Sequence, residues 1–103
     1  MIKYKVTSSD EEYKIEVKGH ANQNPYGQDI VCASVSTMLI MTYNLIERLN
    51  LFSCNITAPV CEEGLFVLNM KKSDNTLNEI LNNLSDSLGM LESAYPKYIK
   101  SEK

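Results

Sequence analysis

Apolar and polar residues alternate near the start of the chain. Positions 2, 4 and 6 are apolar and positions 3, 5 and 7 are polar, and the same alternation returns at residues 13–17. A period of two is typical of a strand with one face buried. The polar residues 8–11 between the two segments favour a turn. The pattern therefore predicts two strands, joined as a hairpin.

A long apolar segment follows a loop predicted at residues 21–28. Asp29 is a good N-cap residue, and the segment from residue 30 to 49 has no charged residue before Glu47. We predict one long helix there. Little of its circumference is suited to water, so part of it must pack on a second helix or on another subunit. The residues themselves thus favour a homodimer.

The second half of the chain repeats the order of strands and helix. Residues 55–60 and 65–70 read as strands of a second hairpin around a turn at residues 62–64, with Pro59 favouring an edge position or a bulge in the first of them. Leucine and isoleucine then recur at three- and four-residue steps between residues 77 and 91, which predicts an amphipathic helix. Residues 95–103 give no clear signal. We expect an α+β fold in which an antiparallel four-stranded sheet carries two helices, in the order strand, strand, helix, strand, strand, helix.

Length and charge limit the function classes. The 103 residues suit one domain, residues 1–103, and 44% apolar and 22% charged residues are ordinary for a globular protein. The net charge is -3, and the ten Lys and Arg residues are scattered along the sequence. We therefore expect no direct contact with nucleic acid. The chain has no signal-peptide pattern and no uninterrupted apolar run of about 18 residues, so we expect a cytoplasmic protein without a membrane partner.

Cysteine and histidine content points to thiol chemistry without a metal. Three cysteines without a secretory signal favour reduced thiols. The chain lacks a Cys-x-x-Cys pair and has a single histidine, so it offers no tetrahedral zinc site. We expect neither a metal nor another cofactor.

The single histidine, His20, and Cys32 are the candidate catalytic residues. With Asp29 as N-cap, Cys32 is the third residue of the helix, where the free amides and the helix dipole favour a thiolate. His20 ends the second strand, and the loop can return it toward the thiol as a general base. The amides near Cys32 and Gly27 could donate to an oxyanion.

Less specific interpretations stand beside this one. A single cysteine on an apolar helix is usually a core residue, and a single histidine at a strand end is usually a surface residue. Asp29 fits a third catalytic member as well as a helix cap. Ser36, one turn after Cys32, could bond within a site or only to the preceding turn of its helix.

The arrangement Gly19-His20, six residues, Gly27-x-Asp29-Ile-Val-Cys32-Ala and then Ser36 resembles the bacterial ribosomal-processing cysteine proteases. The resemblance implies a homodimer that uses a Cys/His dyad, without a cofactor, to remove a short N-terminal extension from large-subunit ribosomal protein twenty-seven. His20 and Cys32 match the catalytic pair. Gly19, Gly27, Asp29 and Ser36 match supporting positions. The enzyme would recognise a peptide rather than RNA, in keeping with its acidic charge.

Two other function classes remain open from the sequence. A thiol redox sensor would need a resolving thiol, Cys54 or Cys61, within disulfide range of Cys32. A non-catalytic ribosome-assembly module would use the dimer as a docking surface, and it would keep its function in a Cys32→Ala variant.

Overall fold

The structure of the protein is a computed structural model that describes residues 1–19, 26–49, 60–62, 65–71 and 75–102. Its elements, in chain order, are β1 (Ile2–Ser8), β2 (Glu12–Lys18), α1 (Tyr26–Arg48), β3 (Val60–Glu62), β4 (Leu65–Lys71), α2 (Asn75–Ala94) and β5 (Ile99–Ser101). The predicted α+β class with two helices is confirmed.

The strands form one sheet in the order β3-β4-β2-β1-β5. β1 and β2 pair antiparallel, with Tyr4 opposite Val17, as the alternation predicts. β4 pairs antiparallel with both β2 and β3, so the second hairpin extends the sheet from the first. β3 lies at an edge, which agrees with the expectation drawn from Pro59. That proline and the rest of the segment 55–59 lie outside the described residues.

Two details of the predicted sheet are wrong. The sheet has a fifth strand, β5, which pairs parallel with β1 and makes the sheet mixed rather than antiparallel. A strand of three residues with one buried side chain, Ile99, is too short to show a period in the sequence. In addition, the turn predicted from residue 62 begins later, because Glu62 still pairs with Leu65 in the ladder of β3 and β4.

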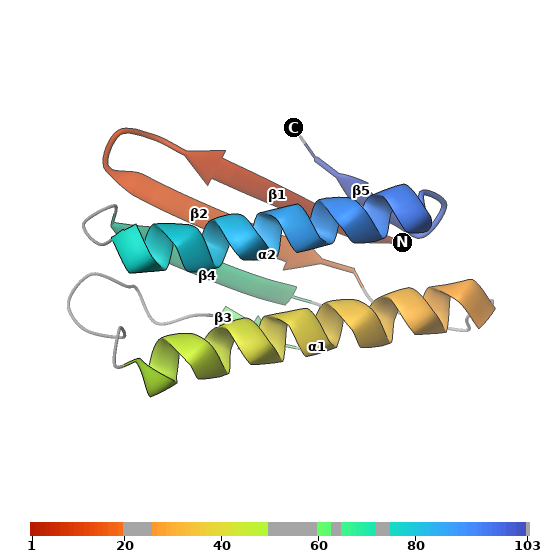
Figure 1. The fold of residues 1–103 in the computed structure, drawn as a ribbon. Helices are drawn as coiled ribbons and strands as arrows, with labels where there is room; N and C mark the ends of the chain where they lie inside the picture. Colours follow the sequence, from red (N-terminus) through yellow and green to blue (C-terminus); the bar gives the residue numbers. More distant parts are fainter. Residues whose placement is uncertain (20–25, 50–59, 63–64, 72–74, 103) are drawn as a thin grey trace.

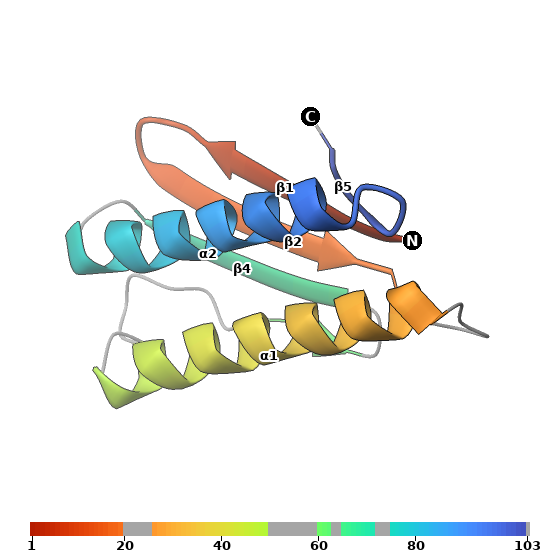
Figure 2. The ribbon, with the colours of Figure 1, turned by 45° about the vertical axis from the view of Figure 1, so that its right-hand side comes forward.

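Both helices cover the same side of the sheet, and α1 lies beside α2 (Figures 1 and 2). The core lies between the sheet and these helices. α2 contributes Leu77, Leu81, Leu84 and Leu88, each at most 2% exposed, at the predicted three- and four-residue steps. The strands contribute their inward-facing residues, namely Ile2, Tyr4, Tyr13, Ile15, Val17, Phe66, Leu68 and Ile99.

α1 begins earlier than predicted and buries only one side. Residues 26–28, which the sequence predicts to lie in the loop, form the first turn of α1. Val31, Val35 and Ile46 enter the core. The exposed apolar residues of this segment are Ile40, Met41 and Leu45 and, just after the helix, Leu49; these four residues are called the apolar stripe. As predicted, one sheet does not cover this helix.

The segment Ile30–Arg48 of α1 is also long and apolar enough, by length and composition, to cross a membrane. Its three core residues pack in the same cluster as the strands and α2. A helix whose side chains complete the core of a layered domain cannot at the same time span a bilayer, so we interpret α1 as a core helix with one uncovered side.

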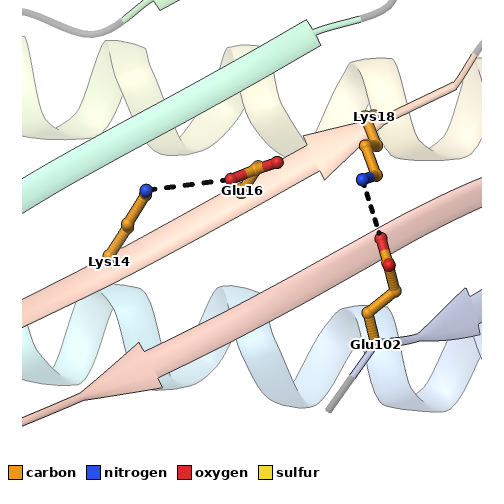
Figure 3. Close-up of polar contacts among 4 residues, drawn as sticks. All are labelled: Lys14, Glu16, Lys18 and Glu102. Atoms are coloured by element: carbon orange, nitrogen blue, oxygen red, sulfur yellow. Dashed lines mark ion pairs between the residues drawn. The ribbon is translucent and has the colours of Figure 1, made fainter.

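Five lysines lie together on the uncovered side of the sheet, so the prediction that the basic residues are scattered is wrong for this face. Lys3, Lys5, Lys14, Lys18 and Lys100 all occupy outward positions of β1, β2 and β5. Figure 3 shows two of them, Lys14 and Lys18, on the side of the sheet away from the helices. Residues far apart in the sequence are brought together because β1 lies between β2 and β5.

Candidate active site

Cys32 lies in the second turn of α1 and is partly buried against the core. Its immediate neighbour Val31 is fully buried and Val35, one turn later, is 4% exposed. These two valines fix the helix on the sheet, and their β-branched side chains have few accessible rotamers. The cysteine is therefore held on a rigid support, and its thiol is free of any disulfide. No pattern in the sequence distinguishes these two valines from other core residues.

The earlier start of α1 changes the predicted electrostatics of the thiol. Cys32 is the seventh residue of the helix rather than the third, so its backbone N–H belongs to the intrahelical ladder and is not a free oxyanion donor. Asp29 lies within the helix and is not its N-cap. The dipole effect is strongest in the first turn, so the thiolate depends more on a neighbouring base than the sequence suggests.

Gly19 fixes the direction in which the chain leaves β2 toward His20. Its φ is 110°, a region that residues with a side chain rarely adopt. A Cβ atom at this position would also collide with the carbonyl oxygen of Met1. Only glycine fits here, which gives this supporting motif residue a physical role. His20 itself and residues 21–25 lie outside the described residues, so the structure gives no distance between His20 and Cys32.

The other motif residues lie on α1. Gly27 and Asp29 fall in its first turn. Ser36 follows Cys32 by one turn and is exposed. The neighbouring Ser34, not Ser36, donates a 2.8 Å hydrogen bond to the carbonyl oxygen of Ile30, so it is Ser34 that bonds to the preceding turn.

Metal chemistry finds no support in the described part of the chain. Across residues 1–19, 26–49, 60–62, 65–71 and 75–102, no three side chains of His, Cys, Asp or Glu lie close enough to hold an ion. The fold holds the thiol of Cys32 on a rigid part of α1. At the end of β2, Gly19 directs the chain toward His20, the single histidine of the sequence.

Solved structures from two bacteria resemble the chain over almost its whole length. The ribosomal processing protease Prp from S. aureus, in complex with a substrate peptide, has 25% identity and a TM-score of 0.84, covering 99% of this chain and 98% of that chain. The same protease in complex with a covalently linked product peptide gives 25% identity with the same coverage and a TM-score of 0.79. SMU.848 from Streptococcus mutans, at 24% identity, a TM-score of 0.75 and coverage of 99% and 92%, shares the fold.

A comparison with curated protein sequences gave no match. The family model described as cysteine protease Prp matches residues 1–100. That range contains both candidate catalytic residues, the supporting glycines and every strand and helix described above except the last residue of β5, and the chain therefore belongs to the cysteine protease Prp family.

Proposed function

We propose that this cysteine protease removes a short N-terminal extension from a large-subunit ribosomal protein during ribosome maturation. The observation that carries the proposal is the family match over residues 1–100. The S. aureus relative is a ribosomal processing protease and binds a substrate peptide. Its likeness to this chain extends over 99% of the sequence, so the same kind of substrate is the best candidate here.

The proposed mechanism uses Cys32 as nucleophile and His20 as base. The imidazole takes the thiol proton, and the sulfur attacks the carbonyl carbon of the scissile peptide bond. His20 then protonates the leaving amine, and a thioester remains on Cys32. Water, deprotonated by the same imidazole, hydrolyses the thioester and releases the removed extension with a free carboxylate, while the shortened ribosomal protein has already left as the amine. The covalently linked product of the S. aureus protease is consistent with such an intermediate.

The first turn of α1 is the best candidate for the oxyanion donors. A helical side chain leans toward the N-terminus and covers the preceding turn, so the thiol of Cys32 lies over Gln28 and Asp29. The amides of the first four helical residues, Tyr26–Asp29 in sequence, have no intrahelical acceptor. Gly27 lets a substrate backbone approach these amides closely. This assignment replaces the amide of Cys32 with those of the preceding turn.

We also propose a homodimer that buries the apolar stripe. Ile40, Met41, Leu45 and Leu49 are between 43% and 66% exposed in the single chain. The hydroxyls of Ser34, Thr37 and Thr42 each donate to the carbonyl oxygen four residues earlier, at 2.8 to 2.9 Å. The three hydroxyl groups thus already have hydrogen-bond acceptors within the helix. A surface of this kind loses little by leaving water, which favours burial against a second copy.

We place the enzyme in the cytoplasm, because its proposed substrate is synthesised and assembled there. The proposed partner in catalysis is the N-terminal peptide of the substrate, which binds as an extended segment. Family membership favours proteolysis over the redox-sensor and assembly-module alternatives.

The test of the proposed function is direct. The purified protein is incubated with the precursor form of the ribosomal protein, and the products are read by mass spectrometry. We expect two products whose masses add to that of the precursor plus one water. An intact precursor after prolonged incubation with the folded, reduced enzyme would contradict the proposed function.

A further inference from the structure

The outward side of the sheet is a basic surface on an acidic protein. We call Lys3, Lys5, Lys14, Lys18 and Lys100 the lysine face. It holds five of the ten basic residues. Three of the thirteen acidic ones lie beside them, namely Glu12 and Glu16 at outward positions of β2 and Glu102 just after β5. None of the described helices covers this side of the sheet (Figure 3). The net charge of -3 for the whole chain does not reveal this local excess of positive charge.

The strand register places like charges directly beside one another. Lys3 pairs with Lys18 across β1 and β2, and with Lys100 across β1 and β5. Neighbouring strands are about 4.8 Å apart, so three ammonium groups project from within about 10 Å. Like charges at opposed positions destabilise a sheet. Glu102 offsets the charge of Lys18, and Lys3 and Lys100 leave the row with a net positive charge.

Internal ion pairs neutralise only part of the lysine face. Lys18 pairs with Glu102 at 3.3 Å and Lys14 with Glu16 at 3.8 Å. Among the described residues, Lys3, Lys5 and Lys100 have no such carboxylate partner within 4.0 Å, and all three are exposed. These three lysines remain available for an external anion.

We propose that the lysine face binds the phosphate backbone of RNA. Lysine ammonium groups contact phosphates as point charges, and several on one rigid sheet match a repeating anion. The described outward positions of the strands carry no aromatic side chain on which bases could stack, so the binding is independent of sequence. This reverses the expectation drawn from the charge total.

The choice of RNA over an acidic protein rests on the proposed function. A protease that matures a ribosomal protein works where RNA is the dominant polyanion. α1, which carries Cys32, lies on the opposite side of the sheet, so RNA on the lysine face leaves the active site open to the peptide (Figure 1). The RNA contact would concentrate the enzyme near its substrate without taking part in cleavage.

The experiment is a fluorescence anisotropy titration with a labelled single-stranded RNA of mixed sequence, about 20 nucleotides long. The test variant is Lys3→Gln/Lys100→Gln. The matched control is Arg48→Gln/Lys97→Gln, which makes the same change of net charge at exposed positions outside the lysine face. Each protein is measured at about 50 and about 200 mM salt, because phosphate contacts weaken as salt rises.

We expect the test variant to bind RNA roughly tenfold more weakly at the lower salt, and its salt slope to fall by about 1.4, roughly 0.7 for each lysine removed. The control variant should bind like the wild type. The test variant must still fold, since it removes like-charge neighbours, and circular dichroism checks this.

The proposal would be overturned by absence of RNA binding by the wild type at the lower salt, or by equal weakening in both variants. Binding of polyglutamate with no binding of RNA would also overturn it and assign the face to an acidic protein. Cleavage of an isolated precursor peptide is measured in parallel and should be equal in all three proteins. Failure of that cleavage in the wild type would refute the proposed function, whereas absence of RNA binding by a wild type that still cleaves would refute only the lysine-face proposal.

Discussion

The hydroxyl group of Tyr4 donates a 2.7 Å hydrogen bond to Oε1 of Glu92, which joins β1 to α2. The second oxygen of the same carboxylate, Oε2, accepts a 3.1 Å hydrogen bond from the backbone N–H of Ser101 in β5. One carboxylate therefore connects three elements. Tyr4 is only 5% exposed, so the loss of this bond is not readily compensated by water.

This bond makes stability sensitive to alkaline pH. Burial first, and then the hydrogen bond and the negative charge of Glu92, raise the pKa of Tyr4 from 10.0 to about 12. The folded protein holds this proton more tightly than the unfolded chain does. The resulting stabilisation is complete below about pH 10 and is lost as pH rises to about 12, an effect of about 2 to 3 kcal/mol.

Tyr4→Phe isolates this contribution. Burial also raises the pKa of Tyr13, so the wild type has more than one source of alkaline instability. We expect the variant to be less stable than the wild type by about 1 to 3 kcal/mol at neutral pH, with the difference shrinking above pH 10. Urea unfolding at several pH values measures it. A difference that stays constant with pH would show that Tyr4 does not titrate in this way.

Two glycines should respond to alanine in opposite directions. Gly19→Ala places a side chain at φ 110° and against the carbonyl oxygen of Met1, so we expect a loss of about 1 to 3 kcal/mol. Gly89 lies inside α2, where the nearest atom to an added Cβ is Oη of Tyr4 at 3.9 Å. Gly89→Ala should therefore raise stability by about 0.5 to 1 kcal/mol.

Thermal unfolding of both variants gives the comparison. Because Gly19 directs the chain into His20, Gly19→Ala should also lower kcat in the fraction that remains folded, while Gly89→Ala keeps wild-type cleavage. Equal stability of the two variants would contradict the backbone role assigned to Gly19.

Removal of either proposed catalytic group should abolish cleavage without loss of the fold. Cys32→Ala has no attacking atom, and His20→Ala loses proton transfer that is typically worth about 10²- to 10⁴-fold in rate. The losses should not add in the double variant, because the two groups act in one step. Cys54→Ala and Cys61→Ala are the matched controls and should stay active. Wild-type cleavage by Cys32→Ala would show that this thiol is structural.

The apolar stripe provides a test of the dimer. Met41 on α1 is 66% exposed and Met90 on α2 is 74% exposed in the single chain. Met41→Lys should yield monomers at micromolar concentration, because burying an unpaired ammonium group in an interface is costly. Met90→Lys, the same exchange at a similarly exposed position, should leave the dimer intact. Light scattering measures both masses, and a wild-type monomer would refute the homodimer.

Local patterns were sufficient to predict most of the fold. The alternation around Tyr4 and Ile15 marks β1 and β2, because a period of two directly reflects burial of one face. The three- and four-residue steps of the leucines mark α2 for the same reason. β5 escaped prediction since its partner, β1, lies almost a whole chain length away and three residues carry no period.

The candidate site shows the same division between local and non-local information. The types and order of His20 and Cys32 are visible in the sequence and indicate thiol chemistry. The start of α1 was misplaced because Asp29 is a strong capping residue, yet the helix continues one turn further back, to Tyr26. The lysine face depends on register between β2, β1 and β5, which residue order does not reveal.

The pairing of β5 with β1 also has a consequence for folding of the chain during its synthesis. Ile2 and Ile99 lie side by side in a parallel ladder, and both are buried in the core. Contacts between such distant positions form late, because a loop of nearly the whole chain must close. We expect a nascent chain stalled before residue 99 to remain protease-sensitive, and pulse proteolysis of stalled chains of increasing length would detect the step.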